Sequence, residues 1–335
     1  MAASDLVHNT LVKHTAYEKA RRRLDKIYER AANSPDPLCL AVLGESRTGK
    51  SRLFEEFVAD HPIHRISEGQ IVPVLYVKAT SKPTAPGLAE TMLYKMEDPR
   101  WNKDSEREKT FRLYRLLKEA ECRMVVVDEF QQIYDKNSDK VCYDVADWLK
   151  RLADEATVAL VVAGLPRGRA VIQQNEQLAG RFSAPIQLLR FDWEQDEDKD
   201  EFVGILDAFR AQIATEFEIV DLGEREMAFR CYCATGGLMG YLTKLLTEVV
   251  REASEDGRKK ITLAHLHAAH EAATWLTSKV QFVKNPFDPK FSTSPSDELL
   301  QKVKLIGTED DAAPPRPRGK RRTPKAENVN QALSA

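Results

Sequence analysis

The segment GESRTGKS, residues 44–51, has the residue types and the spacing of a phosphate-binding loop. Glycines near both ends allow the backbone to curl until successive N–H groups face inward, and these groups form an anion site. Lys50 would then neutralise the outer phosphates of ATP, and the Ser51 hydroxyl would bind Mg²⁺. A plain glycine-rich turn has no need of lysine followed by serine. The predicted nucleotide-binding residues here are Gly44, Glu45, Ser46, Arg47, Thr48, Gly49, Lys50, Ser51 and Arg52.

A second acidic element, MVVVDEF at 124–130, supplies the carboxylates that such a loop requires. Asp128 ends an apolar run and is predicted to hold Mg²⁺ beside the nucleotide, so Ser51 and Asp128 are the predicted metal ligands. Glu129 is predicted to polarise the attacking water as a general base. Alone, the segment would equally suit a strand that ends in a solvated acidic turn. Together with the phosphate loop, the second carboxylate favours hydrolysis of ATP over phosphoryl transfer to a metabolite.

Charge that develops on the γ-phosphate needs a cation, and NEQLAGRFSAP at 175–185 offers Arg181. In oligomeric ATPases of this architecture, an arginine there commonly reaches the nucleotide of the neighbouring subunit. A surface arginine or an ion pair within the chain is the alternative. We predict Glu129 and Arg181 as the catalytic residues.

Two positions that often hold a phosphate sensor carry other residues in this chain. The fourth apolar run ends in VVAGLPRG (161–168). The role of phosphate sensor is therefore unfilled, or it is taken by the backbone or by Arg167. After TGG at 235–237, Met239 and Tyr241 stand where a further arginine is common. The sequence therefore predicts weak or partner-stimulated hydrolysis.

Five short apolar runs alternate with amphipathic segments and must position these residues. Continuous apolar runs suit strands buried on both faces, and their alternation with helices predicts an α/β fold with a five-stranded parallel sheet. The predicted strands are LCLAVLG (38–44), IVPVLYVKA (71–79), MVVVDEF (124–130), VALVVAG (158–164) and IQLLRF (186–191). The predicted helices between them are SRLFEEFVADH (51–61), GLAETMLYKM (87–96), KTFRLYRLLKEAE (109–121) and VCYDVADWLKRLADEA (141–156).

Beyond residue 193 the pattern becomes purely helical and then polar. Helices are predicted at 195–215, 222–234, 237–254 and 262–279, forming a small lid domain. Proline, serine and charge dominate from 284, which predicts a flexible basic tail. The expected organisation is an N-terminal helical extension (1–35), a nucleotide-binding domain (36–193), a lid (194–283) and the tail (284–335).

The bulk composition restricts the partners and the compartment. A formal net charge of −2 over 335 residues gives no overall attraction to nucleic acid or anionic lipid, so such binding needs a local patch. We find neither a signal peptide nor an apolar run long enough to span a membrane, and expect a cytoplasmic protein. Five cysteines without paired spacing argue against a disulfide framework. Cys231 and Cys233 are expected to be buried thiols.

Several segments, in order, resemble the TniB/TnsC family of AAA+ transposition ATPases over about residues 15–280. The most specific are DEFQ at 128–131 and YDVADWLK at 143–150, whereas the phosphate loop alone is generic. The other matching segments are SKPTAPGLAETML (81–93), VVAGLPRG (161–168) and NEQLAGRF (175–182). The resemblance implies ATP binding and assembly as a ring or helical filament around double-stranded DNA. It also implies partnership with a DDE transposase and a TniQ-like target selector, disassembly on hydrolysis, and a bacterial, nucleoid-associated location.

The resemblance also implies that DNA is contacted by the segment between the second and third strands, 93–115. Its candidate DNA-binding residues are Lys95, Arg100, Lys103, Lys109 and Thr110, with Arg107 and Arg112 as further cations. Such contacts would reach the DNA backbone without reading the base sequence. Acidic residues alternate with these bases, so a solvated helix–loop–helix face is the alternative. The basic run 316–325 suits DNA, an acidic partner or a solubilising extension equally.

Other classes of P-loop protein fit the sequence less well. A replication-initiator or helicase-loader ATPase is the main alternative, but the segment after 280 has too little apolar periodicity for a winged-helix DNA reader. A signalling NTPase would need an effector domain, which we do not find. A metabolic kinase would need an acceptor pocket and a mobile lid, and the Asp128-Glu129 pair argues against it.

Overall fold

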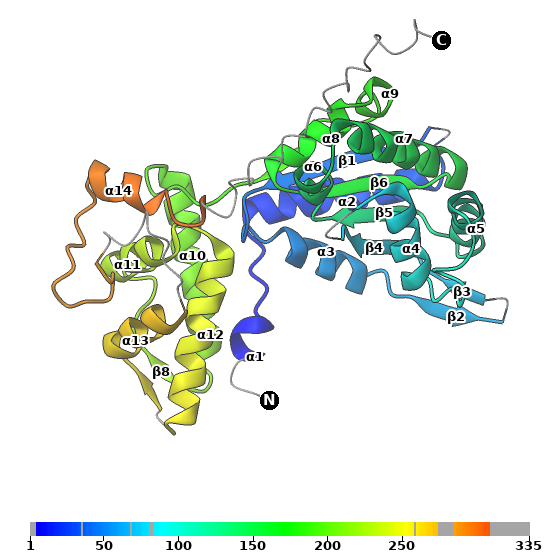
Figure 1. Ribbon diagram of the computed structural model, residues 1–335. Coiled ribbons are helices and arrows are strands. Elements are labelled where there is room, and N and C mark those ends of the chain that lie inside the picture. Colours follow the sequence, from blue (N-terminus) through cyan, green and yellow to red (C-terminus); the bar gives the residue numbers. More distant parts are fainter. Residues whose placement is uncertain are drawn as a thin grey trace, which may run out of the picture.

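A five-stranded parallel sheet forms the centre of the larger of two lobes (Figure 1). The computed structural model describes residues 5–34, 36–67, 69–80, 83–257, 259–273 and 284–308. The strand order is β4-β5-β6-β1-β7, which confirms the predicted sheet. The strands are β1 (Cys39–Gly44), β4 (Val74–Lys78), β5 (Met124–Asp128), β6 (Ala159–Gly164) and β7 (Ile186–Leu188).

Parallel register brings the carboxyl ends of the strands to one edge of the sheet. Leu43 of β1 is paired with Gly164 of β6, and Val127 of β5 is paired with Val162. Gly44 and Asp128 therefore end their strands at the same edge, on either side of β6. Ligands of open α/β sheets bind at this edge.

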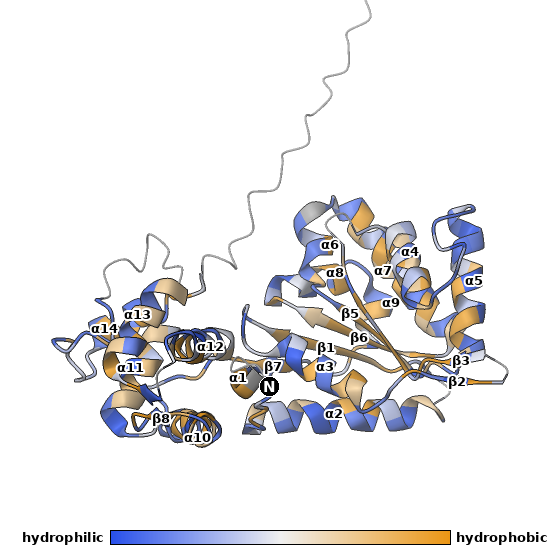
Figure 2. Ribbon diagram, turned by 90° about the horizontal axis from the view of Figure 1, so that it is seen from below, coloured by the Kyte–Doolittle hydropathy of each residue, from blue (hydrophilic) through white to orange (hydrophobic). Residues whose placement is uncertain are grey.

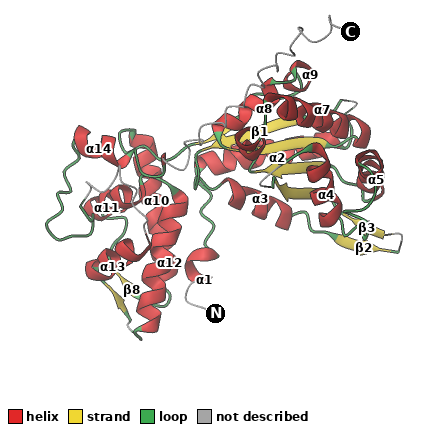
Figure 3. Ribbon diagram, in the orientation of Figure 1, coloured by secondary structure: helices red, strands yellow, loops and turns green. Residues whose placement is uncertain are grey.

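Helices cover both faces of the sheet (Figure 3). Side chains of Leu40 and Val42 face α2 (Thr15–Ala31) and α3 (Lys50–Ala59), and the three elements share one core cluster. Ala41 and Leu43 point to the other face and join a second cluster. Helices of that face are α4 (Ala85–Lys95), α5 (Glu106–Glu119), α6 (Gln131–Lys136), α7 (Asp139–Ala156), the 3₁₀ turn η1 (Pro166–Gly168), α8 (Arg169–Gln173) and α9 (Glu176–Ala179).

The predicted strand 71–79 is divided at its start. Its first residue, Ile71, ends β3 (Gly69–Ile71), which pairs with β2 (His64–Ile66) in an antiparallel hairpin. Pro73 then precedes β4, and its carbonyl accepts the N–H of Arg123. Proline cannot donate to a sheet ladder, which accounts for the break. The hairpin was not predicted, because each of its strands has only three residues.

The smaller lobe is helical and has its own apolar core (Figure 2). Phe202, Phe229 and Leu246 lie in that core. Its helices are α10 (Asp196–Ile213), α11 (Arg225–Thr235), α12 (Met239–Glu255) and α13 (Leu263–Ala273), with a two-residue ladder between β8 (Glu218–Ile219) and β9 (Lys260–Ile261). The predicted helix at 262–279 extends beyond the described residues after Ala273. The N-terminal helix α1 (Asp5–His8) packs on α10 and α12.

Residues 284–308, which the composition assigns to a flexible tail, instead pack on the helical lobe. Phe287 is fully buried, and α14 (Asp297–Val303) places Leu300 and Val303 in the same core as α11. Arg230 donates to the carbonyls of Pro286 and Asp288. Apolar residues spaced among prolines and serines thus anchor this segment. The basic run of the predicted tail lies outside the described residues.

The structure also tests two expectations from the composition, on the cysteines and on membrane-spanning segments. All five cysteines are free and buried, and burial raises the pKa of Cys231 to about 12. Cys231 and Cys233 are the buried thiols that the sequence predicts. No helix in the described ranges combines the length and the apolarity needed to cross a bilayer.

Candidate functional site

The predicted phosphate loop lies between the end of β1 and the start of α3. Gly49 is the N-cap of α3 and has φ 96°, a left-handed conformation that glycine adopts without strain. The helix begins at Lys50, so its first N–H groups open toward the loop. The local sequence thus builds an anion site from backbone groups alone.

Lys50 is folded into this loop. Only 8% of the residue is exposed, and its ammonium donates to the carbonyl oxygens of Gly44 at 2.8 Å and Glu45 at 2.5 Å. A bound phosphate would offer a stronger, charged acceptor within the same reach. The lysine is therefore held at the position from which it can neutralise phosphate charge.

Asp128 lies at the end of β5 and is 1% exposed. Its Oδ2 accepts hydrogen bonds from the Ser51 hydroxyl at 3.0 Å and from the Tyr76 hydroxyl at 2.6 Å. Its Oδ1 accepts the backbone N–H of Glu129 at 2.8 Å. A hydroxyl facing a carboxylate is an all-oxygen donor set, which suits Mg²⁺ that keeps waters and phosphates as further ligands. The donor pair Ser51 and Asp128 therefore fits the predicted metal.

Tyr76 was not predicted as part of this site. It comes from β4, beside β5 in the sheet, and its ring stacks on Phe54 of α3 at 6.1 Å between centroids. Burial, and then the hydrogen bond to Asp128, raise the pKa of Tyr76, so its hydroxyl remains a donor. The only sequence signal was a tyrosine at mid-strand, next to the strand that carries the acidic pair.

Glu129 leaves the strand in a left-handed conformation, with φ 56°. A cavity of about 190 Å³ brings it together with Lys50, Ser51 and Gln131. The amide nitrogen of Gln131 donates to Glu129 Oε2 at 2.5 Å. The structure thus brings Lys50, the Ser51 hydroxyl and Glu129 around one cavity, together with Gln131, the last residue of the DEFQ segment.

The end of β6, a common place for a phosphate sensor, is contacted by a side chain from α6. Arg167 makes a bidentate ion pair with Asp135 of α6, with distances of 2.8 and 2.9 Å. The backbone N–H of Leu165 instead donates to the Gln131 side-chain oxygen at 3.0 Å. Arg167 is thus engaged with α6, and Gln131 is the polar side chain that meets the strand end.

The helical lobe contacts the phosphate loop through α12 and the segment before it. The N–H of Gly240 donates to the Arg47 carbonyl at 2.8 Å, and the Arg47 guanidinium lies 4.6 Å from the Tyr241 ring centroid. Arg190 donates to the Glu45 carboxylate at 2.6 Å. Tyr241, one of the two residues found in place of a sensor arginine, therefore binds an arginine of the loop itself.

A larger cavity of about 430 Å³ adjoins the loop on the side of α12. Its volume is within the range of small-molecule sites. Thr48 and Gly49 of the loop form one side. The remaining lining comes mainly from the N-terminal segment and α12 and includes Val7, Leu11, His14, Tyr17, Met239 and Thr243. Burial lowers the pKa of His14, so its ring stays neutral near pH 7.

Arg181 lies away from the phosphate loop of its own chain. It forms an ion pair with Asp154 of α7, and the next residue, Phe182, bridges to Cys39 at the start of β1. The loop follows the opposite end of that strand. Within one chain, the structure does not bring Arg181 to the other predicted site residues.

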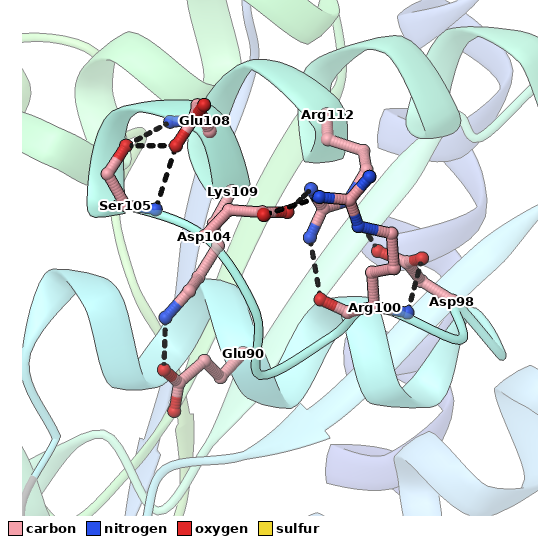
Figure 4. Close-up of polar contacts among 8 residues, drawn as sticks. All are labelled: Glu90, Asp98, Arg100, Asp104, Ser105, Glu108, Lys109 and Arg112. Carbon is pink, nitrogen blue, oxygen red and sulfur yellow. Dashed lines mark hydrogen bonds and ion pairs between the residues drawn. The ribbon is translucent and has the colours of Figure 1, made fainter.

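The predicted DNA-contacting segment joins α4 to α5 and is a network of ion pairs (Figure 4). Asp104 accepts from Arg100 at 2.5 Å and from Arg112 at 2.7 Å. These bonds, Arg100 first, lower the pKa of Asp104. Arg112 also pairs with Asp98 at 2.6 Å. The loop is held in shape by its own charges.

The five predicted DNA contacts differ in exposure. Lys109 is 7% exposed, and its ammonium pairs with Glu90 of α4 at 2.6 Å (Figure 4). The Thr110 hydroxyl accepts from the Trp148 indole at 3.2 Å. Lys95, Arg100 and Lys103 are exposed. Arg100 is paired as above, while Lys95 and Lys103 make no ion pair with a described residue.

Comparison with protein families identifies a match over the first part of the chain. The family model described as "Bacterial TniB protein" matches residues 4–193, more than half of the chain. A search of curated proteins found no significant match.

Solved structures match at low identity over most of the chain. Cdc6p from Pyrobaculum aerophilum has a TM-score of 0.58 and 14% identity, over 88% of this chain and 80% of that chain. The Aeropyrum pernix ORC2 protein, in ADPNP and ADP complexes, has a TM-score of 0.58 and 16% identity, over 82% and 72%. The Aeropyrum pernix ORC1 protein in complex with DNA has a TM-score of 0.55 and 15% identity, over 80% and 69%. At these identities the likeness shows a shared fold, that of AAA+ ATPases.

Proposed function

The chain belongs to the TniB family, and from this premise we propose that it is an ATP-dependent, DNA-binding AAA+ regulator of transposition. In this proposal it oligomerises on double-stranded target DNA as a ring or helical filament. It links a TniQ-like target selector to a DDE transposase and disassembles when ATP is hydrolysed. Residues 36–193 act as the nucleotide-binding domain, and the helices after 194 act as its lid.

The observation that supports ATP binding best is the convergence of Lys50, Ser51, Asp128 and Glu129 at one sheet edge. Lys50 holds the phosphates, with the N–H groups of residues 44–51 around them. Ser51 and Asp128 would hold Mg²⁺, which would supply positive charge to neutralise the phosphates. The adjoining cavity of about 430 Å³ receives the adenosine.

Hydrolysis follows from the position of Glu129. Its carboxylate takes a proton from water while the water oxygen bonds to the γ-phosphorus. The bond from the γ-phosphorus to the β-phosphate oxygen breaks, which yields ADP and phosphate. Lys50 stabilises the charge that spreads over the γ-phosphate oxygens. In this proposal the hydrolytic groups are Lys50, which begins α3, and Glu129, which directly follows β5.

The position of Arg181, away from the phosphate loop of its own chain, supports oligomerisation. Arg181 is half-buried, pairs with Asp154, and lies at the opposite end of β1 from the loop. In the proposed assembly, Arg181 reaches the nucleotide of a neighbouring protomer. It breaks its ion pair with Asp154 and binds the γ-phosphate instead. Full activity would then depend on assembly. This agrees with the weak or partner-stimulated hydrolysis that the sequence predicts.

Contact with duplex DNA is proposed for the loop between α4 and α5 and for the adjoining ends of these two helices. Lys95 and Lys103 are exposed cations that pair with no described acidic residue, and Arg100 lies between them. To contact DNA, Lys109 would have to break its ion pair with Glu90. Thr110 would offer DNA the hydroxyl that accepts a hydrogen bond from Trp148. Two cations per subunit, repeated around one duplex, suffice for salt-dependent binding by a nearly neutral protein. The protein would act in the bacterial cytoplasm on the nucleoid.

A replication-initiator ATPase is the alternative that the sequence raises, and the similar solved structures are of Cdc6 and ORC proteins. These likenesses concern the fold alone. After α13 the structure describes residues 284–308, which contribute α14 to the helical lobe and add no strand. Family membership over residues 4–193 therefore favours the transposition role.

The test is assembly on DNA with and without nucleotide. Electron micrographs of the protein with duplex DNA and a slowly hydrolysed ATP analogue should show rings or filaments, which should disappear without nucleotide. Lys50→Ala should abolish them, because the loop would lose its phosphate-neutralising charge. The exposed Lys26→Ala on α2 is the control and should assemble normally. A protein that ignores DNA with every adenine nucleotide would contradict the proposal.

A further inference from the structure

Gln131 joins the acidic end of β5 to the end of β6. The residue begins α6 and is 4% exposed. Its amide nitrogen donates to Glu129 Oε2 at 2.5 Å, and its amide oxygen accepts the Leu165 N–H at 3.0 Å. Both ends of one side chain are therefore used, one on the proposed base and one on the strand end.

The orientation of this amide is fixed by its partners. A backbone N–H can only donate, so the oxygen of Gln131 must face Leu165. The NH₂ group must then face the carboxylate of Glu129, which accepts when ionised. One of its two hydrogens is used by Glu129, and the second is left for water or a phosphate oxygen. The side chain thus presents a donor to the cavity that Lys50 and Ser51 also line.

Gly164 provides the space for this arrangement. A Cβ at residue 164 would lie 2.2 Å from the Gln131 side-chain oxygen and 3.0 Å from the Phe130 backbone nitrogen. A polar side chain on β6 and the Gln131 amide could not occupy this place together. The glycine at the end of β6 explains both features. It leaves β6 without a sensor side chain, and it makes room for the side chain of Gln131.

We propose that Gln131 is the positioning residue of the hydrolytic site. It orients the Glu129 carboxylate toward the attacking water and supplies from α6 the polar group that β6 lacks. Glu129 has a left-handed backbone and no other side-chain hydrogen bond within the described residues. Anchoring one of its oxygens leaves the other to accept the proton. This inference rests on the proposed ATPase function.

The experiment separates positioning from structural anchoring. Turnover, KM for ATP and the Kd of a slowly hydrolysed analogue are measured on DNA for wild type, Gln131→Leu and Gln131→Glu. Gln131→Leu removes both hydrogen bonds at similar size. Gln131→Glu keeps an acceptor for Leu165 but places a carboxylate where the donor to Glu129 was. Gln132→Leu is the matched control, because this neighbouring glutamine does not line the cavity.

Both Gln131 variants should lose about 10–100-fold in kcat, with KM and Kd within about 3-fold of wild type, as is typical when an orienting partner is removed. The double variant Glu129→Gln/Gln131→Leu should be no slower than Glu129→Gln alone, because the group being positioned is already gone. A kcat within about 2-fold of wild type, or a full additional loss in the double variant, overturns the inference. If Gln131→Leu does not fold, Gln131→Glu decides alone. A wild type that hydrolyses no ATP would instead refute the proposed function.

Discussion

At the residue scale, the site separates two carboxylates that are adjacent in the sequence. Asp128 is buried and receives hydrogen bonds from Ser51, Tyr76 and the backbone of Glu129. Glu129 turns away through its left-handed backbone and reaches the cavity beside Lys50. One carboxylate is thus suited to hold a cation, and the other to accept a proton.

Glu129→Gln should preserve nucleotide and DNA binding while ATP hydrolysis falls by at least about 100-fold. The amide has the size of the carboxylate but cannot take up a proton at neutral pH. Phosphate release and analogue affinity, measured on the same preparation, check this. Glu119→Gln, an exposed change at the end of α5, is the control. Loss of affinity by the same factor as hydrolysis would contradict the role of Glu129.

How much the sequence could predict differs among these residues for physical reasons. Lys50, Ser51, Asp128 and Glu129 belong to short motifs whose spacing alone sets their geometry. Gln131 gains its role only through Leu165, 34 positions later in the chain. Tyr76 reaches Asp128 only because β4 pairs with β5. Contacts across neighbouring elements leave little trace in one sequence.

At the element scale, the helical lobe has a buried histidine that links α13 to the segment after residue 284. The His270 ring lies 6.0 Å from the Phe287 ring, with the two ring planes at 64° to each other. Burial, with a smaller effect of nearby His267, lowers the pKa of His270 to about 4. The folded lobe therefore binds this ring in its neutral form.

We expect the free energy of unfolding to fall as the pH drops from about 6.5 toward about 4. Over this range the unfolded chain takes up a proton at residue 270 and the folded chain does not. At about pH 5 the loss relative to pH 7 is about 2 kcal/mol from this residue. Urea unfolding of His270→Gln should show a correspondingly smaller pH dependence, whereas His267→Gln should behave like wild type. Equal pH dependence in all three proteins would refute this.

The elements themselves were largely predictable from periodicity, and the exceptions have local causes. The five-stranded sheet follows from continuous apolar runs, and the four helices of the smaller lobe follow from long amphipathic patterns. The β2–β3 hairpin and the β8–β9 ladder have too few residues for a pattern. The packing of 284–308 depends on a few apolar side chains, Phe287 among them, in a proline- and serine-rich stretch. Lys109, a predicted DNA contact, is paired with Glu90 on the facing helix, and this contact has no signal in the sequence.

At the scale of the whole molecule, the separation of Arg181 from the phosphate loop predicts complementation between subunits. Arg181→Ala and Glu129→Gln should each be nearly inactive alone, because one lacks the cation and the other the general base, while Glu129→Gln still binds nucleotide and assembles. Mixed before assembly, they should regain up to about a quarter of the wild-type ATPase rate, from interfaces that pair the two intact groups. No recovery would leave the Arg181–Asp154 ion pair as the whole role of this arginine.

The exposed loop between α4 and α5 predicts the salt dependence of DNA binding. Lys103→Ala should reduce the slope of log affinity against log salt by about 0.9 for each DNA phosphate that is no longer neutralised, summed over the subunits on the duplex. The affinity should fall equally for unrelated DNA sequences, since these contacts go to the backbone. Titrations at several salt concentrations, with Lys26→Ala as control, test this. An unchanged slope would remove Lys103 from the interface.

The attachment of the loop to the helical lobe has a mechanical consequence. Arg47 and Glu45 are bound by Gly240, Tyr241 and Arg190, so the predicted phosphate loop is also a joint between the two lobes. A nucleotide bound as proposed would contact this joint, and a movement of the loop would be passed directly to α12. In the proposed assembly, the angle between successive subunits would then depend on the nucleotide that each loop holds.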